Sequence, residues 1–278
     1  MGQRTCAAVV LTCVALLTGC SGSDDEPSGG EKSSSSTDRM VDVGGRSLHL
    51  HCEGSGTPTI VLEAGLDGDE STWSDVARDL KADSRVCMYS RANIPPSDPR
   101  PGTHTAADSA ADLDAMLEAS DEKGPYVLVG FSFGGLITQV YAGEHGDNVA
   151  GLVLVESNHP DEVDQFEQHL TAAQIEEDHA AADANTEAVD VFASFDEAQG
   201  AGGLPDVPLV VVTAPESADW PPGWDPALFN RLRAAQQKDL AASVPGGTQV
   251  IADQSGHDVP HDQPEVVVSA VTQVLAAL

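Results

Sequence analysis

Six short runs of apolar, β-branched residues constrain the fold of this chain more than any other feature of its sequence. Helix-like segments separate most of them, and strands that alternate with helices form a parallel sheet with both faces covered. A hairpin precedes the first run, because residues 41–43 and 46–52 alternate apolar with polar side chains around Gly44-Gly45. The sequence therefore predicts an α/β fold with a mostly parallel central sheet. The expected strands after the hairpin span residues 59–63, 85–89, 126–130, 151–155, 208–213 and 248–253.

Capping residues and apolar spacing indicate the helices. Thr105 and Asp108 have the pattern of a capping box before an amphipathic stretch. Pro264 opens a closing helix with apolar residues on one side. Residues 161–199 are rich in Ala, Glu and Asp and fall between two strands, so we predict a helical cap within an insertion of about 157–206. The other interpretation is an unstructured acidic insertion.

The N-terminus has the pattern of a secretory signal, with Arg4 before an apolar stretch that is too short to span a bilayer comfortably. The segment Leu17-Thr18-Gly19-Cys20 resembles a bacterial lipobox, which implies that residues 1–20 are a lipoprotein signal and that Cys20 carries the lipid. We expect an exported protein anchored through Cys20 on the extracytoplasmic side of the cell membrane. Alternatively, Cys20 is an ordinary residue near a conventional cleavage site. Residues 21–38 are rich in Ser, Gly and acidic residues and predict a flexible tether before a folded domain at 39–278.

The charge of the chain argues against two classes of partner. It has 45 Asp and Glu against 13 Lys and Arg, for a formal charge of -32. Such a chain repels phosphate backbones and anionic lipid surfaces, so we expect no nucleic-acid partner. With 278 residues, 41% of them hydrophobic, it is long enough for one large domain with a substantial core.

The strongest chemical signal is Gly130-Phe131-Ser132-Phe133-Gly134, which lies between an expected strand and an expected helix. A nucleophilic serine on such a sharp turn needs small residues two positions to either side, because neighbouring backbone comes too close for a Cβ atom. The turn would expose the Ser132 hydroxyl and aim the Phe133 backbone N–H at a developing oxyanion. The alternative is a glycine-rich turn with a bystander serine.

At these residues the chain resembles the α/β-hydrolase superfamily, from about residue 41 to the C-terminus. The resemblance implies that the turn at residues 61–68 offers a second oxyanion donor, the Leu66 backbone N–H. It also implies that His257, in the loop after the last strand, is the general base for Ser132. The loop CMYSRANIPPSDP, from Cys87, departs from the family pattern, because Ser90 replaces the usual aspartate and prolines replace glycines.

The acid that orients His257 has three candidates. Many relatives carry it after the strand that corresponds to residues 208–213, where this chain has Glu216 and Asp219 without the usual Gly-x-x-Asp pattern. Some α/β-hydrolases carry it one strand earlier, where the run LVLVE ends in Glu156. We prefer Glu156, with Asp219 and Glu216 as the alternatives.

The remaining histidines and cysteines have separate interpretations. His261, Asp258 and Asp262 share the loop of His257, but Pro260 and the lack of a His-Glu-x-x-His helix argue against a metal site, and no cofactor is expected. His49 and His51 are expected to be solvated on the hairpin. The sheet order of the superfamily would place Cys52 beside Cys87, which implies a disulfide; two reduced buried thiols are the alternative.

The resemblance implies a serine hydrolase with an acyl-enzyme mechanism, and its commonest reaction, cleavage of a carboxylic ester of a small-molecule acyl substrate, is the one we expect. A thioester hydrolase would use the same groups. An aminopeptidase-like enzyme is a further alternative, because the acidic cap could bind an N-terminal amine. A binding protein that kept the scaffold and lost turnover is the alternative of a different class.

Overall fold

The computed structural model of the protein describes residues 36–215 and 220–278. The predicted signal, Cys20 and the candidate acids Glu216 and Asp219 lie outside the described residues. The strands are β1 (Thr37–Asp42), β2 (Ser47–Glu53), β3 (Thr59–Glu63), β4 (Arg85–Ser90), β5 (Tyr126–Phe131), β6 (Val149–Val155), β7 (Leu209–Thr213) and β8 (Thr248–Ile251). The α-helices are α1 (Ser74–Leu80), α2 (Ala106–Ala119), α3 (Phe133–Glu144), α4 (Glu162–Glu167), α5 (Ala172–Ala182), α6 (Val191–Gly200), α7 (Pro226–Ala242), α8 (Val259–Asp262) and α9 (Pro264–Ala276), and the 3-10 helices are η1 (Glu70–Trp73) and η2 (Gly146–Asn148).

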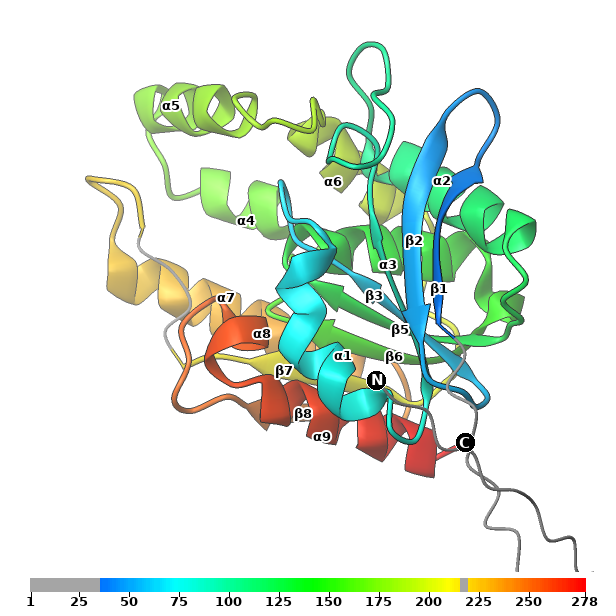
Figure 1. Cartoon of the computed structure of the whole chain (residues 1–278). Helices are drawn as coiled ribbons and strands as arrows, with labels where there is room; N and C mark the ends of the chain where they lie inside the picture. Colours follow the sequence, from blue (N-terminus) through cyan, green and yellow to red (C-terminus); the bar gives the residue numbers. More distant parts are fainter. Residues whose placement is uncertain (1–35, 216–219) are drawn as a thin grey trace, which may run out of the picture. The chain divides into compact units, whose positions relative to one another are not determined.

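Within this described part, eight strands form one sheet in the order β1-β2-β4-β3-β5-β6-β7-β8 (Figure 1). The hairpin β1–β2 is antiparallel and β2 runs antiparallel to β4, whereas all later pairs are parallel. The carboxyl ends of the parallel strands therefore meet at one edge, which is where side chains from segments far apart in the sequence are brought together.

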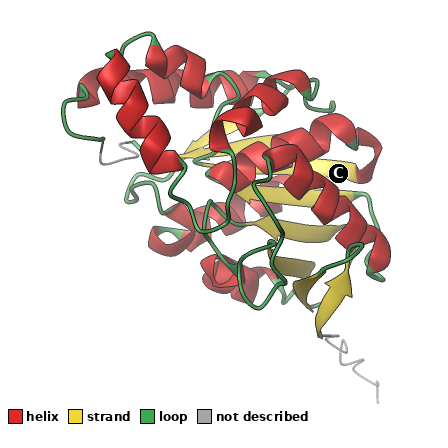
Figure 2. Cartoon of the chain, turned by 90° about the horizontal axis from the view of Figure 1, so that it is seen from above, coloured by secondary structure: helices red, strands yellow, loops and turns green. Residues whose placement is uncertain are grey.

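Helices cover both faces of the sheet, as the continuous apolar strands predict (Figure 2). Alternate strand residues point to opposite faces, so Val61 packs with the side of α2 and α3 while Ile60 and Leu62 pack with the side of α1 and α9. The Thr105–Asp108 capping box starts α2 as expected. The predicted α/β fold with a mostly parallel sheet is confirmed.

The sheet begins earlier than the sequence pattern indicated. β1 starts at Thr37, so Thr37 and Asp38 pair with β2 instead of belonging to the tether. Most β1 side chains are exposed and only Val41 is buried, because an edge strand is held by its backbone ladder and carries little apolar signal. His49 also differs from expectation. Its ring is mostly buried and lies between Asp38 and Glu70, with nitrogen–oxygen distances of 2.8 and 2.7 Å.

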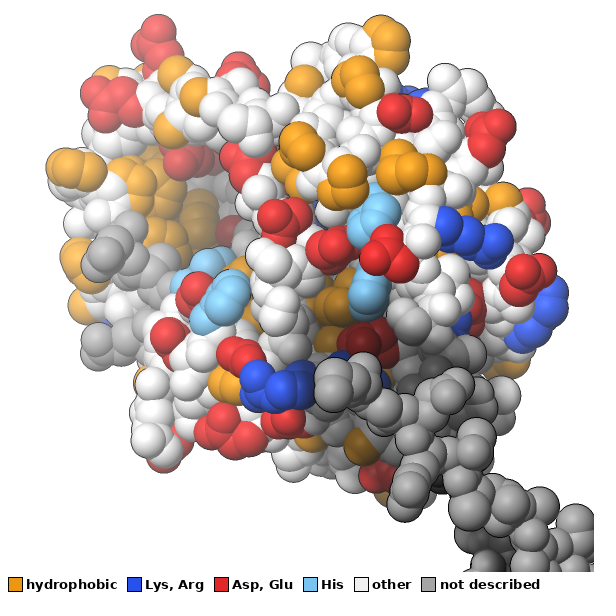
Figure 3. Space-filling model, viewed as in Figure 1, with side chains coloured by type: hydrophobic (Ala, Val, Ile, Leu, Met, Phe, Trp, Pro, Cys, Tyr) orange, Lys and Arg blue, Asp and Glu red, His pale blue; other side chains and the backbone are white. Residues whose placement is uncertain are grey.

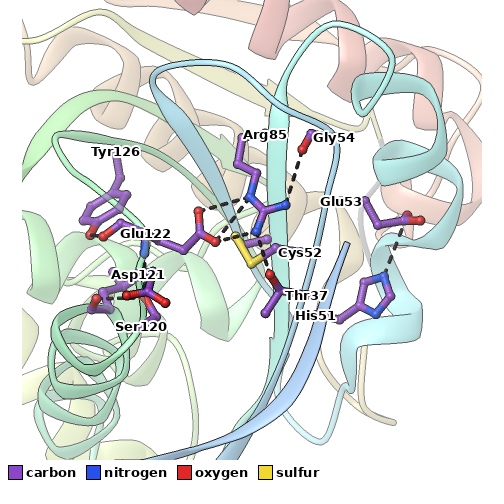
Figure 4. Close-up of a disulfide and its surroundings, with 12 residues drawn as sticks. Thr37, His51, Cys52, Glu53, Gly54, Arg85, Ser120, Asp121, Glu122 and Tyr126 are labelled. Atoms are coloured by element: carbon purple, nitrogen blue, oxygen red, sulfur yellow. Dashed lines mark hydrogen bonds and ion pairs between the residues drawn. A yellow bond between two sulfur atoms is a disulfide. The ribbon is translucent and has the colours of Figure 1, made fainter. Parts of the chain in front are cut away.

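The expected disulfide joins Cys52 and Cys87 across the β2–β4 pair (Figure 4). Next to it, the Arg85 guanidinium contacts the Glu122 carboxylate and donates to the Thr37 hydroxyl. These contacts tie the N-terminal hairpin to the central strands.

The segment between β6 and β7 forms α4, α5 and α6 rather than an unstructured insertion. α6 packs against α2 and α3, and α4 packs against α7. In Figure 1, α4 and α5 lie on the side of the sheet toward which the parallel strands point. Residues 161–199 therefore supply a wall at the edge where the carboxyl ends meet. None of the helices in residues 36–215 and 220–278 is long and apolar enough to cross a membrane.

Candidate active site

Ser132 stands on the sharp turn between β5 and α3. Its backbone has φ 53° and ψ -123°, in the positive-φ region that non-glycine residues rarely adopt. The conformation is held by neighbours on both sides, because the Ser132 N–H donates to the Val155 carbonyl at 3.0 Å and the Ser132 carbonyl accepts from Gly135 and Asn158. This geometry leaves the hydroxyl half-buried above the end of the sheet.

The glycines of the motif are required by close packing. A Cβ atom on Gly134 would overlap the backbone carbonyls of Ala64 and Glu63, and one on Gly130 would overlap the Thr138 side chain. The turn after β3 therefore passes directly beside the serine turn. The sequence reasoning that small residues flank Ser132 agrees with this arrangement.

His257 contacts Ser132 from the loop after β8. Its Nε2 lies 3.0 Å from the Ser132 hydroxyl oxygen, and its ring packs beside Phe131 with the ring centroids 5.1 Å apart. The imidazole side chain is 37% exposed, so part of it remains open to solvent. His261 does not join the site, since its ring contacts the exposed carboxylate of Asp258 at 2.7 Å.

Glu156 reaches the other side of the imidazole from the end of β6. Its Oε2 lies 3.2 Å from His257 Nδ1, and its Oε1 accepts the Ala214 backbone N–H at 2.7 Å. The side chain is fully buried, and its backbone has φ 44°. Ser132, His257 and Glu156 therefore form one continuous hydrogen-bonded chain. The geometry of a carboxylate that fixes one ring nitrogen while the other faces a hydroxyl is the arrangement that activates a serine.

A cavity of about 360 Å³ opens beside Ser132. Leu66 and Phe133, the residues expected to stabilise an oxyanion, line it together with the serine. Its far walls are largely apolar and come from α4, α5, α6 and the segment before α7. In Figure 3 this hollow is seen at the left, where hydrophobic side chains gather between α4, α5 and α7. A concave, mostly apolar site beside a few polar groups is typical of small-molecule binding.

The aromatic part of the cavity was not predicted. Phe166 lies edge-on to Trp220 and Trp224, with ring centroids 5.6 and 6.2 Å apart, and all three pack against Phe229. The rings come from α4, from the segment before α7, and from α7 itself. No local motif in the sequence joins these elements, and only the fold brings them together.

A second unpredicted feature is a buried charge network below the turn after β3. Arg91 contacts the carboxylates of Glu63 and Glu187 and also donates to the carbonyls of Ala64 and Gly65, at 2.6 Å each. All three charged side chains are at most 3% exposed. Burial raises the pKa of the Glu63 carboxyl, while the charge of Arg91 opposes that rise. The network holds the turn that leads to Leu66.

The comparisons with known proteins agree on the fold. Residues 58–189 match the family described as alpha/beta hydrolase fold. An uncharacterised protein of Bacillus subtilis, YqjL, is 25% identical over 249 residues, which are 86% of this chain and 92% of that protein.

Two solved structures have a similar fold. A thermophilic esterase from Thermogutta terrifontis superposes with a TM-score of 0.60 at 19% identity, over 86% of this chain and 98% of that one. The enol-lactonase from Burkholderia xenovorans LB400 superposes with a TM-score of 0.62 at 20% identity, over 86% of this chain and 100% of that one.

Proposed function

The chain has the α/β-hydrolase fold, and from this premise we propose that it is a serine hydrolase that cleaves carboxylic esters through an acyl-enzyme intermediate. One observation carries the proposal. The Ser132 hydroxyl lies 3.0 Å from His257 Nε2, and the opposite ring nitrogen lies 3.2 Å from a buried carboxylate. A serine hydroxyl is a poor nucleophile at neutral pH, and this arrangement supplies the base that it needs.

The proposed reaction has two halves. Ser132 Oγ attacks the ester carbonyl carbon as His257 takes the hydroxyl proton, and the Phe133 and Leu66 amides stabilise the negative oxygen. The carbon–oxygen bond to the alcohol then breaks, and His257 returns the proton to that alcohol. A water molecule then gives a proton to His257 and attacks the acyl carbon. The bond from that carbon to Ser132 Oγ breaks, and His257 returns the proton to Oγ, which releases the carboxylic acid and restores Ser132.

For the acid we propose Glu156. Its support is geometric, because Oε1 is fixed by the Ala214 amide and Oε2 faces the imidazole. This fixes the ring tautomer and stabilises the imidazolium that forms during the reaction. Glu216 and Asp219 remain as alternatives to be tested by substitution.

The cavity favours a neutral ester over an aminoacyl amide. Glu162, Glu167 and Asp178 line it, but Glu162 contacts Arg233 at 3.3 Å and Glu167 contacts His179 at 2.8 Å. Of the three carboxylates that line it in the described residues, two therefore already have partners that compete with a bound amine. The aromatic walls suit an apolar acyl or alcohol group of modest size.

The proposal is tested with a fluorophosphonate probe and a series of p-nitrophenyl esters of increasing chain length, beside aminoacyl anilides. We expect labelling and ester turnover in the wild type and neither in Ser132→Ala, while His261→Gln serves as the matched histidine control for His257→Gln. A wild type that binds ligand but resists the probe would instead indicate a binding protein. Preferential cleavage of the anilides would indicate the aminopeptidase alternative.

The acid is tested separately by comparing Glu156→Gln with Glu216→Gln and Asp219→Asn. We expect kcat to fall by about 10²–10⁴-fold in the first variant and to stay near wild type in the other two. A full loss in Glu216→Gln or Asp219→Asn with an active Glu156→Gln would move the acid to the segment after β7.

We further propose that the protein is exported and anchored through Cys20. The Cys52–Cys87 disulfide supports an oxidising compartment, where such bonds persist. In a bacterial host, Cys20→Ala should move the protein from the membrane fraction to the soluble fraction and abolish its labelling with radioactive palmitate. Unchanged fractionation and labelling would contradict the anchor.

A further inference from the structure

The proposed acid has a second partner that the triad does not explain. Arg233, in the middle of α7, places Nε 3.4 Å from Glu156 Oε2 and donates from Nη2 to the Glu156 backbone carbonyl at 2.8 Å. Its Nη1 contacts Glu162 Oε2 at 3.3 Å. The arginine side chain is 7% exposed. Burying a guanidinium between two carboxylates costs desolvation free energy, which its hydrogen bonds and ion pairs must offset.

α7 brings the arginine there through its helical spacing. Phe229, Arg233, Gln237 and Leu240 are buried and lie on one stripe of the helix, whereas Arg231 is exposed. The same packing of α7 against α4 delivers Glu162 to the other side of the guanidinium.

The contacts of Glu156 are divided among its atoms. The Ala214 N–H fixes Oε1, and Arg233 Nη2 fixes the backbone carbonyl of Glu156, whose φ is positive. The second carboxylate oxygen, Oε2, lies between Arg233 Nε and His257 Nδ1. Rotation of the carboxylate away from the imidazole would break the bonds to Ala214 and Arg233 together. The arginine thus favours one rotamer of the acid.

The charges of the cluster balance the imidazolium. Glu156, Glu162 and Arg233 together carry a formal charge of one negative unit, and His257 completes the set of ionisable side chains in direct contact with them in the described residues. When His257 takes the proton of Ser132, the sum becomes zero. Without Arg233 the cluster would keep one unpaired negative charge in the interior, and without Glu162 it would gain one unpaired positive charge.

We propose that Arg233 and Glu162 are positioning residues that hold Glu156 against His257 and set the charge of the site to match the imidazolium. The inference rests on the proposed hydrolase function. Glu162 also lines the substrate cavity and accepts from the Asn158 side chain at 2.8 Å. The pair therefore connects the wall of the cavity to the acid behind the imidazole.

The test compares the pH profiles of kcat/KM for Arg233→Met and Glu162→Gln on the full-length protein. The first variant leaves an excess negative charge near His257, so the acid limb should move to higher pH by roughly 0.5–1.5 units. The second leaves an excess positive charge, so the limb should move to lower pH by a similar amount. The double variant restores the original sum and should return the limb toward the wild-type position. kcat should fall by about 10–100-fold in Arg233→Met, because the acid loses its fixed position.

Arg233→Lys and Arg231→Met are the controls. The lysine keeps the charge but cannot make all three contacts, so kcat should fall while the acid limb stays near wild type. Arg231→Met should behave as wild type in both. If Arg233→Met does not fold, the shift of the acid limb to lower pH in Glu162→Gln, together with the lower kcat and unshifted limb of Arg233→Lys, still decides the question.

Two kinds of failure are distinguishable. Turnover that survives in Ser132→Ala would contradict the hydrolase function itself. Loss of turnover in Ser132→Ala, together with acid limbs that stay fixed or move in the same direction in the two charge variants, would overturn only the role of Arg233 and Glu162. Lowered thermal stability with unchanged profiles would reduce them to structural residues.

Discussion

Replacing Arg91 with methionine should destabilise the protein by about 3–5 kcal/mol, because it removes the central charge of a buried network. Arg91 is 3% exposed, and its partners Glu63 and Glu187 are 2% and 0% exposed. The substitution would leave both carboxylates without their cation and would remove the donors to the carbonyls of Ala64 and Gly65. Methionine fills much of the volume, so the loss comes mainly from charge and hydrogen bonding.

The loss should depend on pH in a defined direction. Burial already raises the pKa of Glu63, and the charge of Arg91 counteracts it. Without Arg91 the folded-state pKa of Glu63 rises further above its unfolded value. A group shifted in this direction contributes stability that is present below the unfolded pKa and is lost as the pH rises through the folded pKa. The deficit of Arg91→Met should therefore be smaller at pH 5 than at pH 8.

Thermal and urea denaturation followed by circular dichroism measure the effect. For a domain of this size the melting temperature should fall by roughly 6–20 °C. The matched control is Arg78→Met, since Arg78 is 59% exposed and pairs with Asp75 on the surface of α1, so its removal should change the transition little. A deficit below about 1 kcal/mol, or one that grows toward pH 5, would refute the assignment of a stabilising buried charge.

Four further variants test separate parts of the structure. Burial acts to lower the pKa of His49, but its two carboxylate partners raise it, and the pKa is raised overall. The stability that His49 contributes is therefore present at low pH and is lost as the pH rises. His49→Gln should cost more stability at pH 6 than at pH 9 in urea titrations. Burial and a nearby arginine lower the pKa of His104, whose ring nitrogens have no hydrogen-bond partner in the described residues. The wild type should therefore lose stability as the pH falls below about 6.5. His104→Leu should remove that loss, which thermal scans at pH 5 and pH 8 can show. Replacing Cys52 and Cys87 together with alanine opens a loop with a sequence separation of 35 residues and should lower the free energy of unfolding by about 3–4 kcal/mol. An unchanged urea midpoint would contradict the idea that the disulfide restricts the unfolded chain. Gly134→Ala places a Cβ atom against backbone carbonyls and should abolish ester turnover, so full activity in that variant would contradict the packing of the serine turn.

The fold and the hydrogen-bonded chain of the site follow from short-range patterns. Each apolar run marks a buried strand, and the ends of parallel strands share one edge of the sheet, so residues that directly follow such runs are brought together. Ser132 and Glu156 directly follow β5 and β6, and His257 lies in the loop that leaves the same edge after β8. The sequence alone could not decide between Glu156 and the acids after β7, because all of them follow a strand.

The contacts that surround this chain were not predictable from local sequence. Arg91 and Glu187 are separated by 96 residues, and Arg233 and Glu156 by 77, so no periodicity links the partners. One signal was present for Arg233. It occupies the position one turn after Phe229 on the buried stripe of α7, where a charged residue requires a buried partner.

The position of Glu156, the proposed acid, also links α7 to both the cavity and the proposed reaction. Glu156 comes from β6, and the neighbouring β7 and the residue after it contact Glu156 through backbone groups. The Val212 carbonyl accepts the Glu156 N–H at 2.8 Å, and the Ala214 N–H donates to Oε1 at 2.7 Å. The chain after β7 places Trp220 in the wall of the cavity, where it packs against Phe229 of α7. One turn later on the same helix, Arg233 donates to the Glu156 backbone carbonyl. A movement of α7 that reshapes the aromatic wall would therefore also move the group that contacts Glu156. Under the proposed mechanism, this would couple the shape of the cavity to the alignment of the imidazole.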